Sequence, residues 1–170
     1  LLIAAEEWRR ENADNHSLII AIGSSNREES LQNPWSSDER SAMIEVWLSE
    51  SGIQDAEIVS IPDIEDPPNW VAHAEQYHGM AGVLFTSDAP SAELYGEAGW
   101  QVMTTPLDNR ESFEGWRVRE TARMLSTIGD EEAVRAVLSQ TIPSVVVEYM
   151  VRNDALRRLA FLGEGGEPVG

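Results

Sequence analysis

All 12 basic residues of this 170-residue chain are arginines, and arginine has the chemistry to bind phosphate. Its guanidinium group is always charged and holds a phosphate with two hydrogen bonds. Arg40 lies in the segment NPWSSDERSAMI, where an ion pair with Asp38 or Glu45 on the protein surface is the alternative interpretation. Three more arginines occur in the segment DNRESFEGWRVR: Arg110, Arg117 and Arg119. These two segments are where an anion-binding site is to be sought.

A strand, a loop and a helix position Arg40. Residues 18–22 are a short apolar run that ends at Gly23, which predicts a strand buried on both faces. Ser36 and Glu39 have the spacing of a capping box, so a helix is expected to begin there. Its inner face carries side chains at three- and four-residue spacing: Met43, Val46, Trp47 and Glu50. Open α/β sheets bind ligands at the loop of such a unit.

The chain continues this alternation and then changes. A helix is predicted over residues 1–12, strands over 56–62, 81–87 and 100–105, and helices before each of the last two. This order predicts a parallel sheet of the α/β class. After Gly115 three or four helices follow in succession, expected as a C-terminal helical layer on the sheet. One domain is expected over residues 1–162, with a flexible tail over 163–170.

Composition excludes several classes of partner. The formal net charge is −18 and lysine is absent, so the chain repels nucleic acid and anionic membranes. This acidic excess favours a halophilic source with a high-salt cytoplasm over an ordinary acidic protein. No cysteine is present for disulfides or thiolate metal sites. No run approaches the roughly 20 apolar residues that span a bilayer, and no signal peptide is recognisable, so a cytoplasmic protein is expected.

Eight segments occur in a fixed order: IAIGS, NPWSSDERSAMI, IPDI, NWVAH, VLFTSDAP, EAGWQV, DNRESFEGWRVR and IPSVVVEYM. In content and order they resemble the archaeal-type nicotinamide mononucleotide (NMN) adenylyltransferases of the nucleotidylyltransferase superfamily, over residues 1–162. The resemblance implies a Rossmann-like nucleotidylyltransferase fold, a parallel sheet with helices on both faces. It also implies AMP transfer from ATP to NMN, forming NAD and pyrophosphate, with magnesium bridging the ATP phosphates. A homo-oligomer is implied as well, in which Val145, Val146, Val147 and Met150 line either a core or an interface.

One element of the family is absent from this sequence. The family opens with a strand and a GRFQPFHNGH-like phosphate loop carrying an H-x-G-H motif, and His16, His73 and His78 do not have that spacing. From the length of the family's proteins we expect that on the order of 15 to 20 preceding residues hold this strand and loop, and a sheet whose first strand is central would otherwise have a gap. A natural chain that starts late and lacks the catalytic loop is the alternative. The three histidines are assigned no role, and no metal ligands are predicted.

The resemblance assigns the phosphate contacts to arginines. Arg40 matches a family arginine that contacts phosphates, and Arg119 matches one at a helix start that receives the triphosphate; both are expected to act in catalysis. Arg117 either adds charge to the ATP site or faces solvent. The segment departs from the family at Glu114 and Trp116, where small hydroxyl residues are usual, and these larger side chains put the triphosphate contacts in doubt.

The remaining candidates lie near predicted strand ends. Trp70 matches a tryptophan that stacks on the nicotinamide ring, although plain packing explains it equally well and the nearby Pro67 departs from the family's asparagine. Ser87 and Asp88 match a position near the adenosine, and Asp88 is also suited to cap a helix. Two further ATP-binding candidates close the first strand, where glycine permits close approach of a nucleotide: Gly23 and Ser24.

Two other functions stay open at this point. An adenylyltransferase for another acceptor, such as pantetheine phosphate or flavin mononucleotide (FMN), keeps the superfamily and changes the substrate. A non-catalytic nucleotide-binding protein is favoured by the missing histidine loop together with Glu114 and Trp116.

Overall fold

The computed structural model describes residues 1–12, 17–105 and 115–162, and the chain divides into two compact units. The first unit comprises residues 1–26 and 53–108, and the second comprises residues 27–52 and 109–170. Each unit has a hydrophobic cluster of its own. The single domain over residues 1–162 stays a prediction, and the tail over 163–170 lies outside the described residues.

The strands belong to the first unit and pair in parallel. β1 (Leu18–Ile22) pairs with β2 (Ala56–Ser60), and β3 (Val83–Thr86) pairs with β4 (Gln101–Thr104). Within the described residues these are two separate two-stranded sheets rather than one continuous sheet. The parallel α/β arrangement predicted from the sequence is therefore confirmed, while the additional upstream strand stays a prediction.

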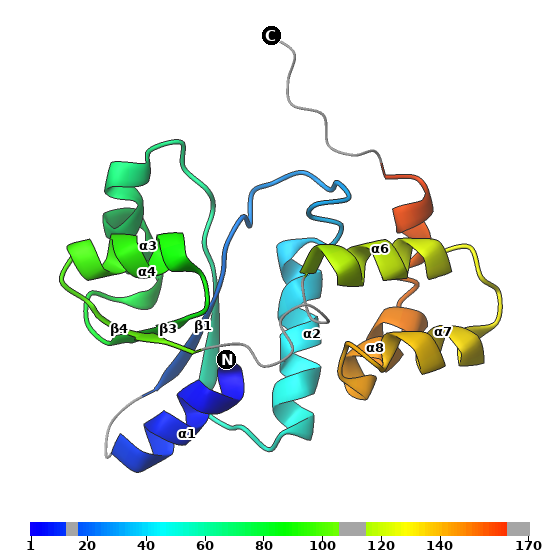
Figure 1. Cartoon of the computed structure of the whole chain (residues 1–170), viewed down its shortest axis with the longest axis horizontal. Helices are drawn as coiled ribbons and strands as arrows, with labels where there is room; N and C mark the ends of the chain where they lie inside the picture. The colour runs from blue at the N-terminus through cyan, green and yellow to red at the C-terminus, as the bar shows by residue number, and fades with distance from the viewer. Residues whose placement is uncertain (13–16, 106–114, 163–170) are drawn as a thin grey trace, which may run out of the picture. The chain divides into compact units, whose positions relative to one another are not determined.

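Helices cover both sides of the strands in this unit (Figure 1). α1 (Leu2–Asn12) contributes Trp8, whose ring lies 5.7 Å from that of Phe85 on β3. The neighbouring Leu84 points the other way, because side chains alternate along a strand. It packs with α3 (Trp70–His78) and α4 (Ala89–Glu97) in a cluster built around Ile61, Val71, Ala74 and Tyr95. A short 3-10 turn, η1 (Pro67–Asn69), precedes α3.

β1 is less buried than its sequence predicts. Leu18, Ile20 and Ile22 on one face are buried, whereas Ala21 on the other face is exposed. The prediction of a strand buried on both faces is therefore wrong. The apolar run predicted burial on both faces because Ile19 and Ala21, on the second face, are also apolar. In the structure Ile19 is only half-buried, and the face that it shares with Ala21 remains accessible.

The second unit is helical in its described residues. It contains α2 (Ser37–Glu50), α6 (Gly115–Leu125), α7 (Glu131–Leu138), α8 (Ser144–Arg152) and the 3-10 turn η2 (Arg157–Ala160). The predicted succession of helices after Gly115 is confirmed, the fourth being only this turn. Val147 and Met150 belong to the buried core of the unit, together with Leu138 and Leu159. Among the helices that the structure describes, none has the length and apolar character needed to cross a membrane.

Candidate functional site

The carboxyl ends of β1 and β2 meet at one edge, because the two strands are parallel. Ser24 follows β1 in the left-handed region, with φ of 54°, and its hydroxyl donates to Asp63 Oδ2 at 2.9 Å. Asn26 clamps the same residue: its Oδ1 accepts from the Asp63 N–H at 2.8 Å, and its Nδ2 donates to the Asp63 carbonyl at 3.1 Å. These contacts hold together the loops that follow the two strands.

Sequence reasoning selected Gly23 and Ser24 at this edge but missed Asn26 and Asp63. The available signal was that both lie within a few residues of a predicted strand end and carry side chains that bond neighbouring backbone. A Cβ placed on Gly23 would meet no atom within 4 Å. Packing within the protein therefore leaves room beside Gly23, which suits the predicted close approach of a nucleotide.

Trp70 begins α3 and is half-buried. Its ring lies 5.8 Å from the His73 ring at a tilted angle, and His73 Nε2 lies 2.9 Å from the Pro62 carbonyl oxygen. The indole also packs against the cluster around Val71 and Ala74. Packing thus accounts for part of the ring, and stacking on a nicotinamide stays a prediction.

Asp88 caps α4, as the sequence suggests. Its Oδ2 accepts from the Ser91 N–H at 2.9 Å and from the Ser91 hydroxyl at 2.8 Å. Ser87, half-buried, precedes it at the end of β3, and the Thr86 hydroxyl accepts from the Asp88 N–H at 3.0 Å. A tight turn thus brings β3 into α4. The adenosine contact assigned to Ser87 and Asp88 stays a prediction.

Arg40 lies in the first turn of α2, in the second unit. The predicted capping box is present: Ser36 Oγ accepts from the Glu39 N–H at 3.2 Å, and Glu39 Oε2 accepts from the Ser36 N–H at 2.9 Å. Arg40 Nε donates to the Ser36 carbonyl at 3.4 Å, so the side chain leans back over the helix start. The capping box therefore fixes the start of α2 and, with it, the position of Arg40 in the first turn.

Arg119 turns back toward the start of α6. Its Nη1 would lie 3.0 Å from a Cβ placed on Gly115, so the absence of a side chain there makes room for the guanidinium. Burial lowers the pKa of Arg119, because removing water disfavours the charged form. No described residue is an ion-pair or hydrogen-bond partner of this guanidinium. A partly desolvated cation beside a helix start is suited to receive an anion.

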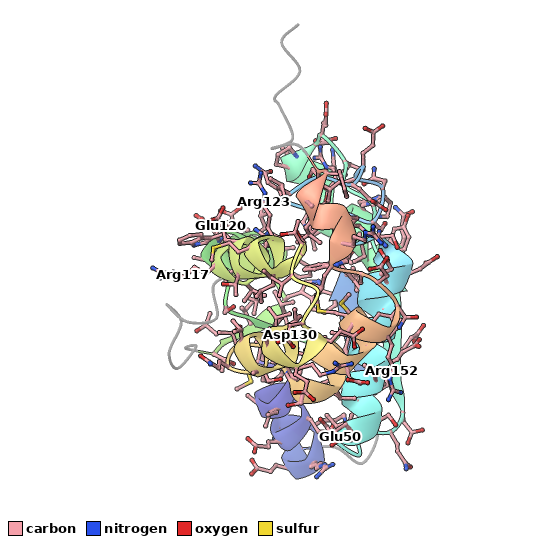
Figure 2. All side chains as sticks on the ribbon, turned by 90° about the vertical axis from the view of Figure 1, so that its right-hand side faces the viewer. Glu50, Arg117, Glu120, Arg123, Asp130 and Arg152 are labelled. Carbon is pink, nitrogen blue, oxygen red and sulfur yellow. The ribbon has the colours of Figure 1, made fainter. Side chains whose placement is uncertain are left out.

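The other residues of this segment differ from Arg119. Arg117 is exposed and extends outward from α6, with its guanidinium carbon 4.8 Å from the centre of the Trp116 ring (Figure 2). Trp116 is itself 53% exposed. Arg110 and Glu114 lie outside the described residues. Of the two arginines of this segment that the structure describes, Arg119 is thus the one whose environment favours an anion.

The predicted contacts fall into two groups. Gly23, Ser24, Trp70, Ser87 and Asp88 belong to the first unit, at strand ends or at the helix starts that follow them. The arginines belong to the second unit, Arg40 in the first turn of α2 and the other two within the first five residues of α6.

A surface pocket of about 530 Å³ lies elsewhere in the second unit. It is lined by the α6–α7 loop, the end of α8 and η2, including Ile128, Asp154 and Arg157. None of the predicted arginine contacts lines it. Within residues 1–12, 17–105 and 115–162, no three His, Cys, Asp or Glu side chains converge as a metal site.

Sequence similarity to archaeal proteins covers most of the chain. It is 33% identical to a nicotinamide-nucleotide adenylyltransferase of Picrophilus torridus over 154 residues, which cover 91% of this chain and 85% of that protein. It is 31% identical to the protein of that name from Archaeoglobus fulgidus over 147 residues, 84% of this chain and 79% of the relative. The corresponding protein of Ignicoccus hospitalis is 29% identical over 164 residues, 95% and 90% of the two chains.

No protein-family model matches the chain. The relatives nevertheless suffice for an assignment, since one of them shares a third of its residues across most of both chains. The chain therefore belongs to the archaeal-type nicotinamide-nucleotide adenylyltransferase family.

Proposed function

We propose that this chain transfers AMP from ATP to NMN, forming NAD and pyrophosphate. Membership of the family supports the reaction class. The observation in the structure that supports it best is the Arg119 guanidinium, which is partly desolvated and turned toward the start of α6. ATP and a mononucleotide are then the two substrates.

The reaction joins two phosphates and releases a third group. A phosphate oxygen of NMN attacks the α-phosphorus of ATP, the bond from that phosphorus to the β-phosphate bridging oxygen breaks, and pyrophosphate leaves with the electron pair. The protein supplies position and positive charge. Arg119 and the N–H groups in the first turn of α6 bind the triphosphate, Arg117 adds charge there, and Arg40 binds the phosphate of NMN. Magnesium would enter with ATP and would add positive charge at its phosphates, and no residue of this chain is proposed to hold it.

The first unit provides the remaining contacts. Trp70 offers an indole face to the cationic pyridine ring of NMN. The edge at Gly23 and Ser24, held by Asp63, receives the nucleotide backbone, and Ser87 with Asp88 lies near the adenosine. The reaction takes place in a salt-rich cytoplasm, which suits the net charge of −18. The chain works as a homo-oligomer, to which exposed apolar side chains such as Met80 and Phe161 contribute.

Acceptor-dependent release of pyrophosphate tests this proposal. The 170-residue chain and the longest chain that its gene encodes are assayed with Mg-ATP in molar KCl, with NMN, pantetheine phosphate or FMN as acceptor. We expect NAD from NMN, and rates at least 100-fold lower with the other two. A preference for another acceptor would contradict the assignment of NMN. ATP binding without transfer to any acceptor would instead support a non-catalytic nucleotide-binding protein.

A further inference from the structure

Two long-range contacts tie the start of α2 to the C-terminal part of the second unit. Trp35 Nε1 donates to the Ala155 carbonyl at 2.9 Å, across 120 residues of sequence. Arg158 in η2 donates to Glu39 in the first turn of α2, across 119 residues. Both contacts act on the segment that immediately precedes Arg40.

The Arg158 contact continues as a relay to Arg40. Arg158 Nη1 donates to Glu39 Oε2 at 3.0 Å, and Nη2 donates to Glu39 Oε1. Glu39 Oε2 also accepts from the Ser36 N–H, and the Ser36 carbonyl accepts from Arg40 Nε. A chain of contacts therefore runs from η2 to the side chain predicted to bind phosphate, and its last bond, from Arg40 Nε to the Ser36 carbonyl, is 3.4 Å long.

The charge of Arg158 matters as much as its position. Glu39 directly precedes Arg40, and an uncompensated carboxylate there would attract the Arg40 guanidinium and repel a substrate phosphate. Arg158 engages both oxygens of this carboxylate, and the side chains of Arg158 and Glu39 are only 31% and 21% exposed. Two-point pairing of this kind is geometrically specific and stronger than a neutral hydrogen bond. Arg158 also reaches Glu29 Oε1 at 3.0 Å.

The residues that carry these anchors are fixed by the core. Ala155 and Leu159 are fully buried in the hydrophobic cluster of the second unit, and Trp35 and Met43 pack against that cluster. The Ala155 carbonyl and the Arg158 side chain thus belong to a segment that the core anchors at Ala155 and Leu159. Precise placement of a phosphate-binding group matters because small displacements of such a group cost rate.

We propose that Arg158 is a positioning residue for adenylyl transfer, which holds Arg40 in its phosphate-binding orientation through Glu39 and Ser36, with Trp35 as a second anchor. The inference rests on the proposed function, because it takes the role of Arg40 from it. Arg158 itself is not proposed to contact the substrate.

A double-mutant cycle in the full-length protein tests the relay. Arg158→Ala is expected to lower kcat/KM for NMN about tenfold, mainly through KM, and Arg158→Lys to restore less than half of the loss. In an Arg40→Ala background the same Arg158→Ala change is expected to cost less than twofold, because residues of one network are not additive. Trp35→Phe keeps an aromatic side chain, although a smaller one, and removes the indole N–H, and we expect about a threefold loss that also disappears without Arg40.

Arg152→Ala is the matched control. This substitution removes the same charge from the same unit. The Arg152 side chain is 75% exposed and pairs with Glu148 at the outer surface of α8 (Figure 2). Its loss is expected to change kcat/KM less than twofold in either background. The inference is overturned if Arg158→Ala costs the same factor with and without Arg40, or no more than Arg152→Ala.

Amide hydrogen exchange separates this inference from the proposed function. Arg158→Ala, but not Arg152→Ala, is expected to raise exchange at least fivefold in the first turn of α2. If the wild-type protein makes no NAD, the proposed function is wrong and exchange alone decides the anchoring. Unchanged exchange in that turn contradicts the inference whatever the activity. If Arg40→Ala retains full activity, both the Arg40 assignment and the relay fail.

Discussion

At the scale of single residues, Arg119 and Arg117 show how environment separates two arginines of one segment. Arg117 is exposed against Trp116, whereas burial lowers the pKa of Arg119. Partial removal of water strengthens the interaction of a guanidinium with an incoming anion, since the effective dielectric constant falls. Gly115 leaves room for this placement. The structure thus favours Arg119 over Arg117 for a triphosphate contact.

Replacing Arg119 tests that contact. Arg119→Ala is expected to lower kcat/KM for ATP at least tenfold, because a lost charge-assisted hydrogen bond costs on the order of 1.5 to 3 kcal/mol. Steady-state kinetics of pyrophosphate release measures the effect. Arg123→Ala is the control, since Arg123 is exposed on the same helix, and it should stay within twofold of wild type. A loss of less than threefold in Arg119→Ala would show that this residue does not bind the triphosphate.

At the scale of one element, α1 is stabilised by a buried carboxylate between two arginines. Glu6 is buried, and it accepts from Arg9 Nε at 2.6 Å and from Arg10 Nε at 2.7 Å. The hydrogen bond from Arg9 lowers the pKa of Glu6 from 4.5 to about 2, with a smaller contribution from Arg10. This ion pair stabilises the fold above about pH 4.5, and its contribution is lost as the pH falls toward about 2.

Neutralising Glu6 tests this linkage. Glu6→Gln is expected to lower the free energy of unfolding at pH 7 by about 2 kcal/mol, less than the full pKa shift would give because Arg10 is largely exposed and screened. The difference from wild type should shrink between pH 4.5 and pH 2, as followed by urea unfolding. Glu7→Gln on the exposed side of α1 is the control and should change stability by less than about 0.5 kcal/mol. A deficit of Glu6→Gln that did not depend on pH would contradict the pKa assignment.

At the scale of the whole molecule, the main feature is the large excess of negative charge. The chain has 30 acidic residues and 12 basic ones, so the carboxylates that remain after pairing repel one another. Self-repulsion destabilises a compact state, and salt screens it over a distance of about 10 Å at 0.1 M and about 3 Å at 1 M. Stability should therefore depend on salt.

Thermal unfolding in KCl tests the halophilic interpretation. Raising KCl from 0.1 to 2 M is expected to raise Tm by on the order of 5 °C or more, which for a chain of this size corresponds to roughly 2 kcal/mol. Sorbitol at equal osmolality is the control for solute exclusion and should have a smaller effect. A Tm that stays constant or falls with KCl would show that the acidic surface is not an adaptation to salt.

Local signals in the sequence determined much of this protein. The spacing of Ser36 and Glu39 predicted the capping box that begins α2, and Asp88 caps α4 as expected. Gly52 and Gly79 end α2 and α3 with positive φ of 66° and 87°. These features were predictable because each depends on residues only a few positions apart. Family segments in a fixed order likewise identified the family, which the relatives then confirmed.

Contacts between distant residues were decided only by the tertiary structure. The division of the strands into two pairs and the exposed face of β1 have no local signature. Asn26 and Asp63 lie near predicted strand ends, but nothing local shows that they bond to each other across 37 residues. The pairing of Arg158 with Glu39 also has no local signature, because the chain has 30 acidic residues and an arginine could pair with many of them. Residue types fix which bonds are possible. The packing of a common core selects which of them form, because it alone brings together groups that are more than 100 residues apart in the sequence.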